Sequence, residues 1–328
     1  MTPPIKLLDG CGRTVEYLRL SVTDRCDLRC TYCIPPGFKN FVTPSNWLTF
    51  DEIERVVGLL ARAGLKKVRL TGGEPLTRPG LSDLARRLRL IPGLDDLSLS
   101  TNGTRLADLA GSLRQAGIAR INVSLDTLDA GRFRQITGRD ALANVLNGLD
   151  VASEAGFTLV KINMVVMGGI NDDEIDAMVK YCAERGFILR LIETMPLGKA
   201  GSSVRHVNLQ PVKQRLQQRY GLIDGAVPGG GPAKYLVSPD GRFNIGFITP
   251  LSQHFCASCN RIRLSADGKL YTCLDGQASL DVGALIRAGT AEADLMAALT
   301  GALQSKPVRH DFGGPRSGEN RVMAAIGG

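Results

Sequence analysis

The sequence predicts an α/β fold: a partial (βα)6, TIM-like barrel followed by a C-terminal α+β region. Strand-like and helix-like segments alternate six times over residues 15–193, which is typical of a parallel sheet covered by helices. Six units fall short of the eight that a complete barrel needs. After residue 193 the alternation gives way to Gly-rich loops, one short helix and two hairpins.

Local patterns justify each element in turn. The first strand is expected over 15–22, and an irregular segment follows it. Thr49 and Glu52 have the spacing of a capping box and start a helix, which Gly64 ends. Further strands are expected at 68–71, 97–101, 121–126, 160–166 and 188–193, each separated from the next by apolar residues at helical spacing.

The last third of the chain is expected to form a separate unit. A helix is predicted around 211–220, with Gly-rich loops at 198–206 and 224–234 on either side of it. Two hairpins are expected to turn at 239–241 and 267–268. We therefore expect a domain over residues 1–204 and a second domain over 205–328.

Composition narrows the functional classes. The formal net charge of +8 favours an anionic ligand. Only 5% of the residues are aromatic, and no basic block is interleaved with aromatics, so we expect no nucleic-acid partner. The start of the chain has no apolar signal core and no apolar run approaches a membrane span, so we expect a cytoplasmic protein without membrane contact. Six of the eight cysteines form two compact triplets, which indicates a metal protein rather than a disulfide scaffold.

The predicted strands alternate between apolar and polar residues. Strands of a parallel sheet that is buried on both faces should be almost entirely apolar. Here one face of the strands carries Arg19, Ser21, Arg69, Thr71, Ser98, Ser100, Asn122, Ser124, Asp126, Lys161, Asn163 and Arg190. An antiparallel sheet with a solvated face also alternates, but the six intervening helices argue against it. We therefore predict a ligand cavity inside the barrel, and its four basic residues predict an anionic ligand.

The first cysteine triplet directly follows the first strand. Cys26, Cys30 and Cys33 have the spacing C-x3-C-x2-C, and thiolates bind soft metals and iron–sulfur clusters. A structural zinc site wants four ligands, yet the chain has no histidine before His206. Zinc and simple packing of the cysteines stay open as alternatives, but three ligands favour a cluster with one open metal position.

The second triplet, Cys256, Cys259 and Cys273, belongs to the second expected hairpin. A two-residue turn at 267–268 would place Cys273 roughly opposite Ile262, close to the other two cysteines. A zinc site with His254 as fourth ligand is the alternative. Arg261 and Arg263 lie two apart on a strand and share one face, which predicts an anionic substrate beside an exchangeable metal position.

The first triplet followed by Gly72-Gly73-Glu74-Pro75 resembles the radical S-adenosylmethionine (SAM) superfamily. Within it, the motifs resemble the GTP 3′,8-cyclase family of molybdenum cofactor biosynthesis. The stretches that carry this resemblance are Arg19-Leu-Ser-Val-Thr-Asp-Arg-Cys26, Thr71-Gly-Gly-Glu-Pro75, Ser124-Leu-Asp126, Asn260-Arg-Ile-Arg263 and the terminal Gly327-Gly328. The resemblance implies two 4Fe–4S clusters, one on each triplet, with SAM on the open iron of the first and the guanine of GTP on the open iron of the second.

The resemblance also implies a reaction and its residues. A 5′-deoxyadenosyl radical would abstract the C3′ hydrogen of GTP, and the C3′ radical would attack C8 to give 3′,8-cyclo-7,8-dihydro-GTP. SAM contacts are implied for Tyr32, Gly73, Ser124 and Met195, and GTP contacts for Arg19, Arg69, Ser100, Lys161, Arg261 and Arg263, to which the alternation adds Arg190. Gly327 and Gly328 would thread toward the active site. The implied partners are an external electron donor and a downstream cyclic pyranopterin monophosphate synthase, and a monomer or homodimer is expected.

Two rival classes stay open. A radical SAM peptide-modifying enzyme can share the first triplet, but such enzymes typically carry more cysteines in the C-terminal part. A zinc protein that binds nucleic acid is the second rival. Cys182 follows apolar residues at helical spacing and is expected in the core, whereas Cys11 receives no role. Ser100 stands where the family often has threonine, and the loop after Cys33 also departs from the family pattern.

Overall fold

The computed structural model describes residues 6–227, 229–312 and 322–327. Its described residues form a mixed sheet of twelve strands in the order β12-β11-β10-β1-β2-β3-β4-β5-β6-β9-β8-β7. The six central strands follow the chain order and are parallel to one another. They are β1 (Tyr17–Thr23), β2 (Lys67–Gly72), β3 (Asp96–Thr101), β4 (Arg120–Ser124), β5 (Val160–Val166) and β6 (Ile188–Glu193).

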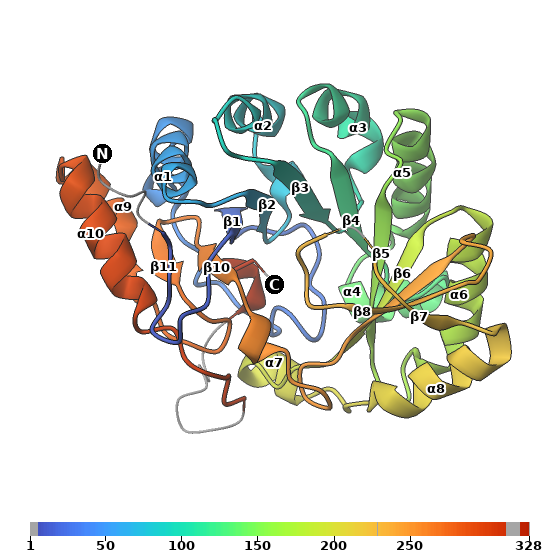
Figure 1. The fold of residues 1–328 in the computed structure, drawn as a ribbon. Coiled ribbons are helices and arrows are strands. Elements are labelled where there is room, and N and C mark those ends of the chain that lie inside the picture. Colours follow the sequence, from blue (N-terminus) through green and yellow to red (C-terminus); the bar gives the residue numbers. More distant parts are fainter. Residues whose placement is uncertain (1–5, 228, 313–321, 328) are drawn as a thin grey trace.

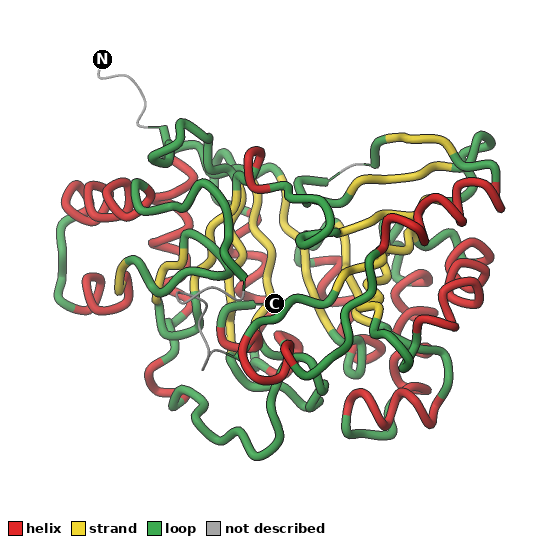
Figure 2. Tube along the Cα trace, turned by 90° about the horizontal axis from the view of Figure 1, so that it is seen from below, coloured by secondary structure: helices red, strands yellow, loops and turns green. Residues whose placement is uncertain are grey.

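Helices cover the outer side of the curved sheet (Figure 1). They are α1 (Phe50–Arg62), α2 (Leu81–Arg89), α3 (Leu106–Gln115), α5 (Leu142–Glu154) and α6 (Ile175–Glu184). The apolar strand residues face these helices: Leu18, Leu70, Leu99, Val123 and Ile162 are all fully buried in one core. Figure 2, turned by 90°, shows the strands running through the middle of the molecule with the helices around them. This α/β arrangement confirms the predicted alternation of strands and helices.

The expected capping box is present at the start of α1. The Thr49 hydroxyl accepts a hydrogen bond from the Glu52 amide at 3.1 Å, and the Glu52 carboxylate accepts one from the Thr49 amide at 2.7 Å. An additional helix, α4 (Ala130–Thr137), was not expected. Its N-cap is Asp129, whose carboxylate accepts a hydrogen bond from the Arg132 amide at 2.7 Å. Local capping of this kind satisfies amides that would otherwise lack a partner.

The C-terminal strands extend the same sheet at both edges. β9 (Asn244–Ile248) lies parallel to β6 and continues into β8 (Lys234–Val237) and β7 (Ile223–Gly225). At the other edge, β10 (Arg261–Leu264) lies parallel to β1 and continues into β11 (Lys269–Tyr271) and β12 (Leu280–Asp281). The two hairpins are present as expected. Their attachment to opposite edges was not expected, because parallel pairing between distant segments leaves no local signal.

Several smaller elements differ from the prediction. The segment expected as a loop at 198–206 contains the short helix α7 (Gly198–Ser202), and α8 spans Leu209–Tyr220. Two helices near the end of the chain, α9 (Val282–Arg287) and α10 (Glu292–Leu303), were not predicted. No helix in the described part of the chain is long and apolar enough to cross a membrane.

The register of the second hairpin is also shifted from the prediction. Leu264 pairs with Leu270 and Arg263 with Tyr271, and the Ser265 amide donates to the Lys269 carbonyl oxygen. The turn therefore contains the three residues 266–268, with Gly268 at φ 87°, instead of two. A three-residue turn of this kind needs a residue in the left-handed region, which glycine adopts at low cost. The shift places Cys273 opposite Arg261 rather than Ile262.

Candidate active site

One cavity inside the curve of the sheet collects both cysteine triplets. Cys26, Cys30 and Cys33 line it from the loop after β1, and Cys256, Cys259 and Cys273 line it from the β10–β11 hairpin and the segment before it. The predicted site residues Tyr32, Gly73, Ser124, Met195, Arg19, Arg69, Ser100, Arg190, Arg261 and Arg263 line the same cavity. Parallel strands place their carboxyl-end loops at one rim, which is why a loop after β1 and residues 71–73 at the end of β2 meet there.

Lys161 lies elsewhere. It lines an adjoining cavity together with Arg69, Arg120, Arg190 and residues 224–227, 229–231 and 233–235. Because Arg69 and Arg190 line both cavities, the two are neighbours. Lys161 is the second residue of β5 and Arg120 is the first of β4, so this basic cavity lies toward the amino ends of the strands. The predicted cationic interior is therefore divided between a part lined by the cysteines and a part that contains Lys161 and Arg120.

The first triplet is buried enough to favour neutral thiols. Burial raises the pKa of Cys26 and of Cys33 to about 12, and it raises that of Cys30 well above its ordinary value. The Leu28 amide and the Asn102 side-chain amide donate to the Cys26 sulfur at 3.4 and 3.8 Å. Such donors, together with a bound metal, favour the thiolate form. Among the described residues, no three His, Cys, Asp or Glu side chains are gathered around a single metal-ion position.

The backbone after β2 runs against the first cysteine loop. A side chain at Gly72, whose φ is +141°, would overlap the Thr23 carbonyl oxygen, and one at Gly73 would overlap the Arg25 carbonyl oxygen. Only glycine permits this approach. Next to it, the fully buried Glu74 carboxylate accepts hydrogen bonds from the Leu76 amide, the Thr101 hydroxyl and the Asn102 amide at 2.6–2.9 Å. The Gly-Gly-Glu-Pro motif therefore joins the rims of β1, β2 and β3.

Tyr32 is tied to the rim of β4. Its hydroxyl donates to the Asp126 carboxylate at 2.7 Å, and the other oxygen of that carboxylate accepts from the Val165 amide at 2.8 Å. Burial raises the pKa of Asp126 to about 6, although these two hydrogen bonds oppose the increase. Asp126 therefore orients the ring of Tyr32, which in the sequence stands between Cys30 and Cys33.

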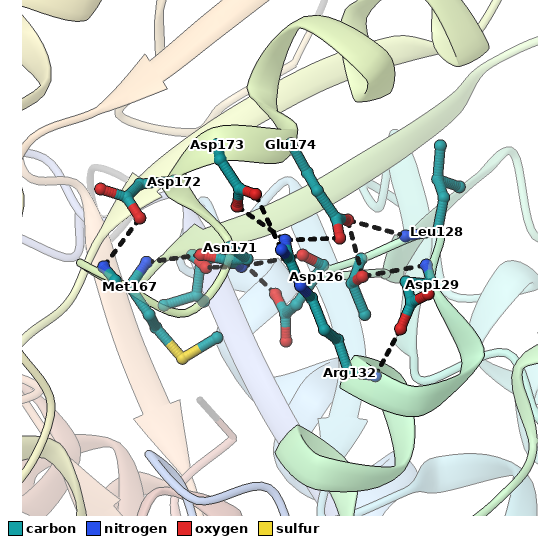
Figure 3. Close-up of polar contacts among 12 residues, drawn as sticks. Asp126, Leu128, Asp129, Arg132, Met167, Asn171, Asp172, Asp173 and Glu174 are labelled. Carbon is teal, nitrogen blue, oxygen red and sulfur yellow. Dashed lines mark hydrogen bonds and ion pairs between the residues drawn. The ribbon is translucent and has the colours of Figure 1, made fainter.

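A hydrogen-bond network holds Asp126 in place (Figure 3). The buried Asn171 side chain donates to the carbonyl oxygens of Asp126 and Val165 at 2.8 and 2.9 Å and accepts from the Met167 amide at 2.7 Å. Beside it, Glu174 accepts from Thr127 and Arg132. The loops after β4 and β5 are thus pinned together at the rim. Asn171 and Glu174 had no place in the sequence analysis, because nothing local marks a loop residue that bonds to another loop.

The arginines of the cavity are buried and close to one another. Burial lowers the pKa of Arg190 to about 10, and the neighbouring charge of Arg69 adds to the effect. Burial and then Arg261 likewise lower the pKa of Arg263 to about 10. The Nε atoms of Arg69 and Arg190 are buried without a hydrogen-bond partner among the described residues. Buried cations that repel one another are costly unless an anion joins them, so the cavity is built for an anionic ligand.

The lowered pKa of the buried Lys161 can be detected as a pH dependence of stability. Burial, followed by the charges of Arg190 and Arg120, lowers its pKa to about 7, and its Nζ contacts the Tyr235 hydroxyl at 3.3 Å. At this residue the unfolded chain binds more protons than the folded protein between about pH 7 and the ordinary lysine pKa of 10.5. The contribution of Lys161 to the free energy of unfolding therefore rises with pH across that window.

We accordingly expect the slope of melting temperature against pH between pH 7 and 10 to be more positive in the wild type than in Lys161→Met. Differential scanning calorimetry on both proteins would measure the two slopes. The exposed Lys180, which pairs with Glu184 on α6 at 3.9 Å, offers a control in Lys180→Met. Equal slopes in the wild type and Lys161→Met would contradict the lowered pKa.

The second triplet lies among cations. Burial would raise the pKa of Cys259, but Arg261 and Lys306 outweigh it and lower the pKa to about 7. The Arg261 guanidinium also lies over the Phe255 ring, 5.1 Å from its centroid. His254, the candidate fourth zinc ligand, instead contacts His310 through its Nδ1 at 3.2 Å. The three cysteines of this triplet therefore have no fourth protein ligand among the described residues.

The end of the chain returns into the cavity. Arg19 donates to the Gly327 carbonyl oxygen at 2.9 Å, and Arg263 donates to the same oxygen and to that of Ile326. Gly327 has φ +66°, and a side chain there would overlap Thr71. Figure 1 shows this segment inside the curve of the sheet. Two of the predicted GTP-binding arginines therefore hold the tail in this structure, and Gly328 lies outside the described residues.

Tyr17 and Arg120 line the cavities but had no place in the sequence analysis, whereas Asn163 was expected on the inward face and lines the cavity. The Tyr17 hydroxyl is buried without a hydrogen-bond partner in the described part of the chain, and Arg69 lies over its ring. Arg120 forms a buried ion pair with Asp96. Tyr17 and Arg120 lie on the inward side of their strands, so the alternation could have revealed both of them. Cys182 is buried in the core on α6, as expected.

Comparisons with known proteins agree with this fold and site. The sequence profile described as "Radical SAM superfamily" matches residues 20–182, and that described as "Molybdenum Cofactor Synthesis C" matches residues 187–312. The fold is similar to that of Streptococcus suis SuiB bound to S-adenosylmethionine, with a TM-score of 0.57 over 80% of this chain and 60% of that chain at 15% identity. The fold and the cysteine loop thus define a radical SAM protein.

Curated relatives narrow this class. The chain is 45% identical over 320 residues to GTP 3′,8-cyclase 1 of Pseudomonas aeruginosa, covering 96% of each protein. It is 44% identical to GTP 3′,8-cyclase of Erythrobacter litoralis, covering 97% of this chain and 96% of the relative. The chain belongs to the GTP 3′,8-cyclase family. Its cofactors are accordingly 4Fe–4S clusters and S-adenosylmethionine.

Proposed function

We propose that this enzyme converts GTP to 3′,8-cyclo-7,8-dihydro-GTP for molybdenum cofactor biosynthesis, by abstraction of the C3′ hydrogen and attack of C3′ on C8. One observation carries the proposal: both cysteine triplets and the buried arginines line a single cavity. A radical generated at one triplet needs its substrate at short range, and a nucleotide held at the other triplet meets that need. The arginines supply the fork-shaped donors that triphosphate oxygens bind.

The residues present fit the proposed clusters. Each triplet offers three sulfurs to the cavity and no fourth protein ligand among the described residues, which leaves one metal position for an exogenous group. Cys26, Cys30 and Cys33 would hold a cluster that, when reduced, would supply the electron for reductive cleavage of SAM. Tyr32, Gly73, Ser124 and Met195 line the space beside this triplet and would hold the SAM. Asp126 keeps the Tyr32 ring in one orientation.

The substrate would extend between the two cysteine triplets and the basic cavity. Arg261 and Arg263 lie on β10 beside the second triplet and would orient the guanine there. Arg69 and Arg190, which line both cavities, would direct the triphosphate toward Lys161 at the amino ends of the strands. Arg19 and Ser100 complete the predicted GTP contacts. A triphosphate bound between these residues would reduce the repulsion among the buried cations. This charge compensation would contribute to the affinity for GTP.

The tail would act within this site. Its Gly327 carbonyl oxygen occupies donors of Arg19 and Arg263, which the substrate would also use. We propose that the tail keeps the empty site ordered and helps position the substrate once it binds. The proposed tail includes Gly328, which lies outside the described residues.

Gly327→Ala is expected to displace the tail, because its Cβ would overlap Thr71 and its φ of +66° is costly for alanine. The turnover of GTP should fall by about tenfold or more, since a strain of 1–3 kcal/mol opposes the native tail conformation. Iron content should stay at the wild-type level. Ala325→Gly, in the short helix before the tail, serves as a control that leaves the Thr71 contact intact. Wild-type turnover in Gly327→Ala would rule out a role for the tail.

An anaerobic single-turnover experiment tests the function. The protein with its clusters loaded is mixed with reductant, SAM and GTP deuterated at C3′, and the 5′-deoxyadenosine is analysed by mass spectrometry. We expect deuterium in that product. Unlabelled 5′-deoxyadenosine, formed at a rate that does not depend on GTP, would show that the substrate is not GTP. A peptide would then be the next candidate. The absence of 5′-deoxyadenosine would reject the proposal.

Metal analysis distinguishes the proposed clusters from a structural zinc site. Iron with acid-labile sulfide at both triplets agrees with the proposal, whereas zinc without sulfide at the second triplet would support a structural zinc site there. We further propose that residues 1–204 bind SAM and that residues 205–328 supply the second cluster. An external electron donor and a downstream cyclic pyranopterin monophosphate synthase would be the partners of a monomer or homodimer.

A further inference from the structure

A buried lysine lies against the second cysteine triplet. Lys306, which follows α10, is 4% exposed. Its ammonium donates to the carbonyl oxygens of Arg261 and Thr272 at 2.7 and 2.6 Å and to the Cys259 sulfur at 3.5 Å. These three contacts exhaust the donors of an ammonium group. They connect the start of β10, the end of β11 and one cysteine, so a single side chain joins the parts of the chain that form this site.

The charge of Lys306 has no carboxylate partner among the described residues. The ionisable groups that act on it are Cys259, Cys273 and the cation Arg13. A buried ammonium is costly unless an anion faces it. The anionic partner of Lys306 is therefore the negative charge that the Cys259 and Cys273 sulfurs carry when they are metal ligands.

Arg13 also connects the second triplet to the segment that contains Lys306. The Asp9 carboxylate pairs with its Nε at 2.6 Å, which leaves the terminal nitrogens to donate to the carbonyl oxygens of Cys256, Pro307 and Val308 at 2.7–3.1 Å. Arg13 thus ties the first cysteine of the triplet to the residues that directly follow Lys306. Neither Arg13 nor Lys306 lines the cavity, so neither competes for the substrate.

We propose that Lys306 is a positioning residue for the second iron–sulfur cluster: its ammonium orients the Cys259 sulfur toward the cavity and places a fixed positive charge beside the cluster. The proposal rests on the proposed presence of that cluster. Hydrogen bonds to the ligand sulfurs and the net local charge both set cluster potentials. Because reduction adds a negative charge, a neighbouring cation raises the reduction potential.

The test isolates the second cluster in the full-length chain. Cys26, Cys30 and Cys33 are replaced by alanine, and Lys306→Met, Lys306→Arg and Lys269→Met are made in that background. Lys269→Met is the matched control, since Lys269 lies at the turn end of the same hairpin and pairs with Asp267 in solvent. Each protein is reconstituted anaerobically with ferrous iron and sulfide. Iron and sulfide are assayed, and the midpoint potential is measured by redox titration followed by electron paramagnetic resonance.

We expect the midpoint potential of Lys306→Met to be more negative than that of the control. In Lys306→Arg the potential should return most of the way to the control value. Loss of iron from Lys306→Met but not from Lys306→Arg would equally support the proposal. Equal potentials in Lys306→Met and Lys269→Met would overturn it, and so would Lys306→Arg behaving as Lys306→Met does. No iron or sulfide in the background protein itself would instead reject the second cluster, which is a failure of the proposed function.

Discussion

Replacing Cys30 with alanine is expected to abolish the formation of 5′-deoxyadenosine. Cys30 is the middle ligand of the first triplet, and the loss of one of three sulfurs leaves the proposed cluster without a stable set of ligands. Iron content should fall to the amount that the second triplet holds. The measurement is iron and sulfide per chain, together with 5′-deoxyadenosine produced from SAM under reducing conditions.

Cys182→Ala provides the control for this experiment. Cys182 is buried in the core on α6 and does not line the cavity. Its replacement should lower the free energy of unfolding by about 1 kcal/mol, as for an ordinary core truncation, and should leave iron content and SAM cleavage unchanged. If Cys30→Ala retained SAM cleavage at the wild-type rate, the first triplet could not be the site of the reaction.

Arg190→Met is expected to have the second largest effect, with opposite signs on catalysis and stability. Arg190 is 3% exposed, donates to the Asn122 side-chain oxygen, and is repelled by Arg69. Removing one partner of a buried charged contact typically costs 2–5 kcal/mol, so kcat/KM for GTP should fall by about 30- to 4,000-fold. Steady-state kinetics with varied GTP measures this loss.

The stability of the ligand-free Arg190→Met protein should be equal to or above that of the wild type. An apolar side chain of similar volume replaces a buried cation without loss of an ion pair. Calorimetry without nucleotide measures this, and Arg242→Met, which alters an exposed arginine on the β8–β9 turn, is the control. A large fall in stability together with unchanged KM would assign Arg190 a structural role instead.

The inward side chains of the barrel were predictable because period-two alternation is a local property of a strand. Arg19, Arg69, Ser100 and Arg190 line the cavity as that alternation requires. Arg120 was missed only because the strand was expected to begin one residue later. The set of inward residues that could be named thus depended on where each strand was expected to begin and end, and a sequence pattern defines these boundaries less well than it defines the strand itself.

Other parts of the site could not be predicted, because they depend on contacts between distant segments. The pairing of β10 with β1 joins residues more than two hundred positions apart. The contacts of Lys306 and Arg13 with the second triplet are of the same kind. In the hairpin of Cys273, a turn of three residues instead of two moved the register by one, and sequence alone does not decide between these turn types.

The attachment of β10 to β1 has a consequence for how the protein is made. The rim around the first triplet, from Glu74 and Asn102 to Asp126 and Asn171, is encoded before residue 172 and can form while synthesis continues. The second site needs β10, β11 and Lys306 together, so it cannot form until nearly the whole chain has left the ribosome. Long-range parallel pairing is also slow to form. The order of the chain therefore favours assembly of the rim around the first triplet before assembly of the site around the second triplet.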